Sequence, residues 1–192
     1  MEKIASIFRK IARPPIFAVA FLLVVYLVDP TSMGSILQLF GGILTLGVLP
    51  ILGYPLQKYI PHFRDKGREG QRSLAMIFCF VGYLLGTLIA VFTHAPADLL
   101  MIYLCYLSCG ICMLILNKLF HFKASGHACG ITGPVFALSM YFHLYIPALV
   151  GALLTVLVFA SSVKTKEHTA RQLIGGTAIA AVCITALTVI FL

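Results

Sequence analysis

The stretch ACGITGPVFALSMYFHLYIPALVGALLTVLVFAS, which covers residues 128–161, contains no Lys, Arg, Asp or Glu. It is much longer than the roughly 20 residues that one membrane-spanning helix needs. His143, Tyr145 and Pro147 stand near its middle. A histidine, a tyrosine and a proline so close together favour a turn at a membrane surface over a continuous buried helix. We therefore predict two short crossings here, joined by a turn.

The remainder of the chain is also apolar. Of its 192 residues, 60% are hydrophobic and only 10% are charged, whereas a soluble domain has about a quarter charged residues. This composition excludes an ordinary soluble globule. Further apolar spans are predicted at about residues 15–28, 35–55, 74–93, 98–117 and 173–192. The expected fold is an all-α polytopic transmembrane bundle of six to seven spans, in which residues 1–192 form a single membrane-embedded domain.

The placement of charge supports two crossings within residues 128–161. All 14 Lys and Arg residues fall in four clusters, at 3–13, 58–72, 118–123 and 164–171. Two crossings bring all four clusters to one side of the membrane, whereas a single crossing would move the last cluster to the other side. The only charges left for the opposite side are Asp29 and Asp98. Because basic loops stay inside, we expect a multi-pass protein of the cell (inner) membrane with a cytoplasmic N-terminus and cytoplasmic basic loops.

The segment Lys123-Ala124-Ser125-Gly126-His127 precedes the long apolar stretch. A helix that begins here has unpaired backbone N–H groups, which favour an anion such as phosphate. Gly126 allows close approach of the backbone, Ser125 adds a hydroxyl donor and Lys123 adds charge. His127 is placed to donate a proton to a leaving oxygen. An ordinary N-cap followed by an interfacial histidine explains this segment equally well when it is taken alone.

Two other basic segments contain residue types that are not needed to orient the protein in the membrane. His168 and Gln172 are four residues apart and share a helix face if the last helix has already begun. The Gln172 carbonyl would then accept the Nδ1 proton of His168 and leave Nε2 free as a nucleophile. Residues 64–72 contain four cations, which would stabilise a phosphoryl group during transfer. The alternatives are a polar loop that caps the last helix and a solvated loop that only sets topology.

Together, and in this order, the three segments resemble the type-2 phosphatidic acid phosphatase superfamily, which comprises the lipid phosphate phosphatases and their haloperoxidase relatives. The resemblance covers about residues 64–176, the expected phosphatase-like core, and follows a basic N-terminal segment, residues 1–13. The resemblance is strongest to short prokaryotic membrane members of the superfamily, which have Lys-x-Ser-x-His and His-Thr-x-x-Gln signatures. Here these signatures are Lys123-Ala124-Ser125-Gly126-His127 and His168-Thr169-Ala170-Arg171-Gln172.

The resemblance implies a lipid phosphatase that needs no metal and no cofactor. In such an enzyme His168 would attack phosphorus to give a phosphohistidine, His127 would act as general acid, and Gln172 would occupy the orienting position. The expected substrate-binding residues, from the motifs and the cations beside them, are Lys66, Arg72, Lys123, Ser125, Gly126 and Lys164. The expected substrate is a polyprenyl diphosphate or phosphate, a phosphatidylglycerol phosphate or a phosphatidate.

The chain departs from the family pattern in each motif. Lys66 and Arg72 are one residue closer together than in the family, and no proline follows Arg72. Ala124 replaces a proline, and Ser162 stands where the family has an arginine, with Lys164 the nearest cation. Gln172 replaces an aspartate that would stabilise the imidazolium. A slower enzyme or an altered pH dependence is the expected consequence.

Two functions of other classes stay open at this point: a lipid-phosphate-binding protein without activity, and a transporter of an anionic solute. Membrane lipids are expected partners and nucleic acid is not, since the basic residues flank membrane spans. Cys109-x-x-Cys112 is assigned to packing, so no metal site is predicted. Gly82-x-x-x-Gly86 predicts close helix packing, within the bundle or in a homodimer. Interfacial positions are expected for four other histidines, His62, His94, His121 and His143.

Overall fold

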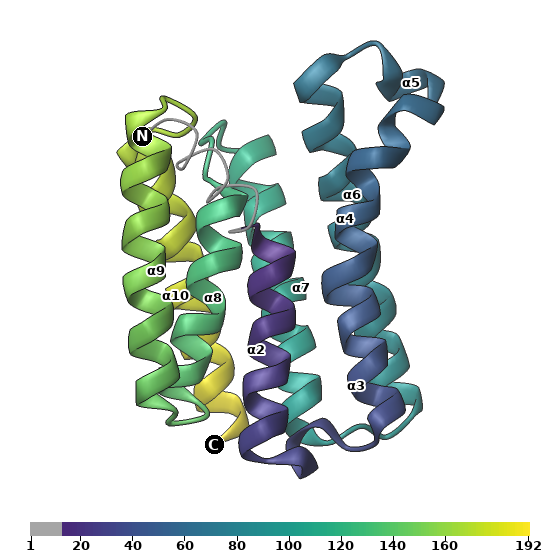
Figure 1. Ribbon diagram of the computed structural model, residues 1–192, viewed down its shortest axis with the longest axis vertical. Helices are drawn as coiled ribbons and strands as arrows, with labels where there is room; N and C mark the ends of the chain where they lie inside the picture. Colours follow the sequence, from purple (N-terminus) through teal and green to yellow (C-terminus); the bar gives the residue numbers. More distant parts are fainter. Residues whose placement is uncertain (1–12) are drawn as a thin grey trace.

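The computed structural model describes residues 13–192, and all regular structure in that part of the chain is helical (Figure 1). Five of its helices are long and apolar enough to cross a membrane. These are the irregular helix Ile36–Tyr59, α6 (Gly67–Phe92), α7 (Ala97–Lys118), α9 (Tyr145–Lys164) and α10 (Ala170–Phe191). Two shorter helices, α2 (Pro14–Val28) and α8 (Gly126–Met140), have 15 residues each. The expectation of an all-α membrane bundle is confirmed at this level, while residues 1–12 of the basic N-terminal segment lie outside the described part.

The long apolar stretch is divided as the sequence predicts. Helix α8 ends at Met140 and α9 begins at Tyr145. Between them, the Leu144 N–H donates to the Leu138 carbonyl at 2.7 Å, and His143 has a φ of 54°. A residue in the left-handed region reverses the chain at a helix C-terminus and ends the helix.

Two other histidines at predicted boundaries have the same conformation. His94 follows α6 with a φ of 48°, and His121 follows α7 with a φ of 50°. Lys166 has a φ of 57° after α9. Histidine adopts this region more readily than β-branched residues do. The location of these histidines is thus explained by the ends of helices.

The second predicted span is helical but irregular. It consists of α3 (Ile36–Gly42), the π-helical segment η2 (Ile43–Val48), α4 (Leu49–Leu56) and the 3-10 segment η3 (Gln57–Tyr59). At the junction the Leu49 N–H donates to the Leu44 carbonyl, five residues back. Pro50 has no N–H to continue the α-helical pattern. The turn Pro30–Met33 (η1) precedes this span, and the short α5 (Pro61–Arg64) follows it at the basic end.

The glycines of the Gly82-x-x-x-Gly86 motif are used inside the chain. A Cβ at Gly82 would meet the Thr45 carbonyl oxygen of η2, and one at Gly86 would meet the Tyr103 ring of α7. The Thr45 and Tyr103 hydroxyls are themselves hydrogen-bonded at 3.0 Å. The motif therefore serves close packing of α6 within the bundle, and its presence does not require a second copy.

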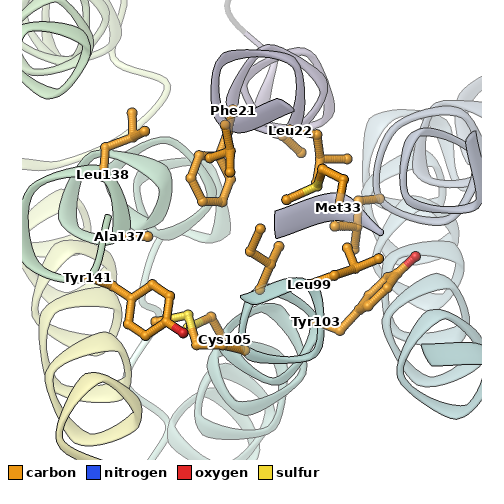
Figure 2. Close-up of a cluster of buried hydrophobic side chains, with 14 of the residues drawn as sticks. Phe21, Leu22, Met33, Leu99, Tyr103, Cys105, Ala137, Leu138 and Tyr141 are labelled. Carbon is orange, nitrogen blue, oxygen red and sulfur yellow. The ribbon is translucent and has the colours of Figure 1, made fainter. Parts of the chain in front are cut away.

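The main core lies between α2, α7 and α8. Figure 2 shows side chains of these helices gathered in one cluster, among them Phe21 and Leu22 of α2, Leu99 of α7 and Leu138 of α8, and all four are buried. Helices in lipid gain little from the hydrophobic effect, so this contact is held mainly by van der Waals packing. At the end of the bundle near Asp29, the Ser32 hydroxyl donates to Asp98 at 2.6 Å. The basic loops lie at the opposite end (Figure 1).

Candidate active site

The two histidine motifs are brought together because the first turns of α8 and α10 touch. The Ser125 N–H donates to the Gln172 carbonyl oxygen at 3.0 Å. A Cβ at Gly176 would clash with the Ser125 carbonyl oxygen, and one at Gly175 would clash with the Phe122 ring. The Gly175-Gly176 pair therefore permits the contact that fixes the relative position of the motifs.

Both motifs also cap their helices. Ser125 is buried, and its hydroxyl oxygen accepts the Ala128 N–H at 3.2 Å, which makes it the N-cap of α8. At the start of α10, the Thr169 hydroxyl oxygen accepts the Gln172 N–H at 3.3 Å, and the Gln172 side-chain carbonyl accepts the Thr169 N–H at 3.2 Å. This is a capping box. The capping interpretation of both segments is thus correct as structure, and it leaves the histidines available for chemistry.

His127 and His168 face one another at the basic end. Their ring centroids are 6.2 Å apart and their planes differ by only 20°. His127 lies in the first turn of α8, just before the apolar stretch begins, and His168 lies in the loop between α9 and α10. Both are partly buried. The sequence separates these residues widely, and only the contact between α8 and α10 makes them a pair.

Burial and the nearby positive charge of Arg72 lower the pKa of both histidines. Burial lowers the pKa of His168 below its ordinary value, the positive charge of Arg72 lowers it further, and a hydrogen bond with Gln172 and the charge of Glu167 oppose these effects. Burial lowers the pKa of His127 to about 4, with contributions from His168 and Arg72. Arg72 thus acts on both histidines. An anion bound beside them would counter its effect and raise both pKa values.

The other predicted cations are placed differently. Lys66 Nζ donates to Nε2 of His62 at 3.0 Å and lies 5.8 Å from the centroid of the Phe63 ring, so it is directed toward α5 and not toward the histidine pair. Lys123 and Lys164 are exposed at the basic end. Gly126 is exposed as well, and a Cβ there would meet only the Met113 methyl group, at 3.6 Å.

Ser162 stands where the resemblance predicts an arginine. Its side chain is only 2% exposed, and its carbonyl oxygen accepts the Glu167 N–H at 3.1 Å. Space for an arginine is therefore lacking at this position. The loop it helps to close is instead approached by Arg68 of α6, whose guanidinium is 4.0 Å from the Glu167 carboxylate.

Sequence reasoning missed two residues that shape this end of the bundle. The Asn117 side chain accepts the Ala124 N–H at 2.8 Å and so holds the segment before Ser125. The Arg13 guanidinium lies 4.7 Å from the centroid of the Tyr54 ring. A polar residue at the end of an apolar helix is the only sequence signal for Asn117.

Two of the cysteines lie close together inside the bundle. The sulfur atoms of Cys112 and Cys183 are 3.6 Å apart in the interior between α7 and α10. Among residues 13–192, no group of three or more His, Cys, Asp or Glu side chains is arranged to hold a metal ion.

The fold and this site define a class of protein: a helical bundle suited to a membrane, with paired histidines and an arginine at its basic end. Comparison with known proteins does not narrow the class, since no family model, curated protein or solved structure matches the chain.

The two site glycines give a matched test of this geometry. Gly176→Ala is expected to cost about 1–3 kcal/mol of stability, because a buried Cβ must displace the α8 backbone. Gly126→Ala is expected to change stability by less than about 0.5 kcal/mol, since its Cβ would have room. Thermal unfolding of both variants in detergent measures the difference. Equal midpoints would show that α8 and α10 do not meet at Gly176.

Proposed function

We propose that this protein is an integral-membrane lipid phosphatase, a short member of the type-2 phosphatidic acid phosphatase superfamily. It hydrolyses a phosphate or diphosphate monoester of a lipid, without a metal ion, through a phosphohistidine intermediate. The observation that carries the proposal is the pair His127 and His168, with ring centroids 6.2 Å apart and Arg72 acting on both. The motif order in the sequence supports it independently.

The first step transfers the phosphoryl group to the protein. Nε2 of His168 attacks phosphorus, the N–P bond forms, and the bond from phosphorus to the leaving oxygen breaks while His127 gives that oxygen a proton. A nucleophile must come within about 3–3.5 Å of phosphorus, and an acid within about 2.6–3.2 Å of the oxygen it protonates. With their centroids 6.2 Å apart and their planes nearly parallel, the two rings can both direct ring nitrogens at one phosphoryl group bound along their edges.

The second step regenerates the protein. Water attacks phosphorus, the N–P bond breaks with its electron pair returning to His168, and His127 accepts the proton from water. Arg72 and the N–H groups of Gly126 and His127 in the first turn of α8 stabilise the charge on the phosphoryl oxygens. We assign Lys66, Lys123 and Lys164 to attraction of the anionic headgroup, because they are exposed at the same end of the bundle.

The substitution Gln172→Asp is expected to change the pH dependence. A carboxylate beside His168 favours its protonated form and raises its pKa, which is lowered in the native protein. The nucleophile is then protonated up to a higher pH, so the acid limb of kcat/KM moves to higher pH. Profiles of kcat/KM against pH measure this shift. Gln172→Asn is the control, because it has the length of Asp without its charge; identical profiles for Asp and Asn would refute a role of position 172 in tuning His168.

We further propose that α2 and α8 cross the membrane with the five longer helices, which gives seven spans and a cytoplasmic basic end. At 15 residues each, these helices cover about 22 Å, less than the roughly 30 Å of a typical hydrocarbon core, so the bilayer thins beside them. A fluorescent protein that matures only in the cytoplasm is expected to light up when fused to the N-terminus and to stay dark after Leu192. Fluorescence from both fusions would contradict seven crossings.

The direct test of function is phosphate release by the detergent-purified protein in the presence of EDTA. The substrates are a short polyprenyl diphosphate, phosphatidylglycerol phosphate and phosphatidate. We expect release from at least one of them, and the preferred lipid identifies the pathway. No release from any of them by folded protein would favour a lipid-phosphate-binding protein. Two departures from the catalytic pattern, Gln172 and the buried Ser162, make this the second candidate.

A further inference from the structure

We propose that an apolar groove between α9 and α10 holds the hydrocarbon chain of the lipid phosphate; this rests on the proposed function. The groove has a volume of about 850 Å³. Its α9 wall includes Val156, Phe159 and Val163, and its α10 wall includes Leu173, Ile174 and Ala178. A volume of this size is typical of a small-ligand site.

The groove exists because α9 and α10 each pack more closely against α8 than against each other. They are consecutive helices joined by a short loop, yet each packs closely on α8, and within residues 13–192 they are not a closely packed pair. Figure 1 shows both beside α8. Small side chains widen the space between them, among them Ala160 and Ala181.

One end of the groove adjoins the proposed site. Its lining includes Lys164 at the end of α9 and Ala170 at the start of α10, and His168 lies in the loop between these two residues. Lys164 is the only charged residue of the lining, and the rest is apolar apart from the Thr177 hydroxyl. The groove therefore matches an amphiphile with an anionic head at Lys164 and His168 and an apolar chain beyond them.

The extent of the groove fits one chain within one leaflet. The lining spans residues 156–164 of α9 and 170–181 of α10, which at 1.5 Å per residue correspond to roughly 12–17 Å. That is about half of the roughly 30 Å hydrocarbon core of a bilayer. A chain held there would run from the basic end to about the bilayer midplane.

The groove would orient the substrate more than attract it. A chain that leaves lipid for an apolar groove exchanges one apolar environment for another and gains little free energy of transfer. Held along α9 and α10, however, it fixes the direction from which the phosphate approaches His168, which lowers the entropic part of the barrier. The expected effect is therefore on the selectivity between long-chain and short-chain phosphates.

Filling the groove tests this inference. Ala178 is exposed and lines the groove, whereas Ala186, also exposed on α10, does not line it. We expect Ala178→Phe to lower the ratio of kcat/KM for dodecyl phosphate to that for ethyl phosphate by about tenfold or more. Ala186→Phe, the control, should leave that ratio unchanged. An unchanged ratio in Ala178→Phe, or an equal fall in both variants, would overturn the proposal.

A binding experiment separates failure of the groove from failure of the proposed phosphatase activity. Dodecyl phosphate with a diazirine in the middle of its chain is photolysed with the full-length protein, and labelled peptides are mapped. We expect labels on residues 156–163 and 173–181, lost in Ala178→Phe and competed by dodecyl phosphate but not by dodecanol. This labelling in a protein that releases no phosphate would retain the groove and reject the enzyme. Labels spread over all lipid-facing helices, or competed equally by dodecanol, would reject the groove.

Discussion

Replacing His168 by Asn is expected to lower phosphate release at least about 10³-fold, because a phosphohistidine cannot form without the nucleophile. Asn keeps one hydrogen-bonding group and the loop position of His168, and the loop itself is closed by backbone contacts to Ser162. Global unfolding is therefore not the expected cause of the loss. The measurement is steady-state phosphate release in EDTA, together with acid-labile radioactive phosphate on the protein after rapid quenching. The wild type is expected to carry that label and His168→Asn is not.

His121→Asn provides the matched control. His121 lies at the same end of the bundle and adopts a φ of 50°, which asparagine tolerates well. Its replacement should leave release and labelling unchanged. If His168→Asn retained more than about a tenth of the wild-type rate, or if both variants lost activity equally, His168 would not be the nucleophile.

The helices could be predicted because charge and hydropathy are strongly segregated in this chain. The expected span at 98–117 corresponds to α7 (Ala97–Lys118), and the turn expected near His143 separates α8 from α9. The π-helical segment Ile43–Val48 was not foreseen. It depends on Thr45 meeting Tyr103 and on Gly82 packing beside it, and such contacts between distant segments leave no periodic signal in the sequence.

The geometry of the candidate site could be predicted only in part from the sequence. The motifs place His127 and His168 at one end of the bundle by topology, but their 6.2 Å separation depends on Gly176 admitting the backbone of Ser125. The direction of Lys66 could not be derived from spacing, because it depends on how α5 presents His62 to it. Long flexible side chains in loops find their partners through tertiary structure.

His127→Asn is expected to produce a loss that depends on the leaving group. For alkyl phosphates, whose leaving alcohol needs a proton, loss of a general acid costs about 10²–10⁴-fold. For p-nitrophenyl phosphate, whose leaving group is stable as an anion, the loss should be smaller by at least about tenfold. The pKa of His127 is lowered to about 4 by burial, His168 and Arg72. In the proposed mechanism His127 therefore gains its proton as the phosphate binds, because the negative charge of the phosphate opposes Arg72 and stabilises the imidazolium.

The comparison of the two substrates is measured as kcat/KM for wild type and His127→Asn, with His168→Asn beside them. The nucleophile is needed for both substrates, so His168→Asn should lower kcat/KM equally for both. His127→Asn should lower kcat/KM much less for p-nitrophenyl phosphate than for the alkyl phosphate. Equal losses for both substrates in His127→Asn would assign His127 to phosphate binding instead of proton transfer. The two proposed roles are therefore distinguished by experiment although the rings are only 6.2 Å apart. A nucleophile acts on the bond that forms to phosphorus, whereas a general acid acts on the bond that breaks to the leaving oxygen.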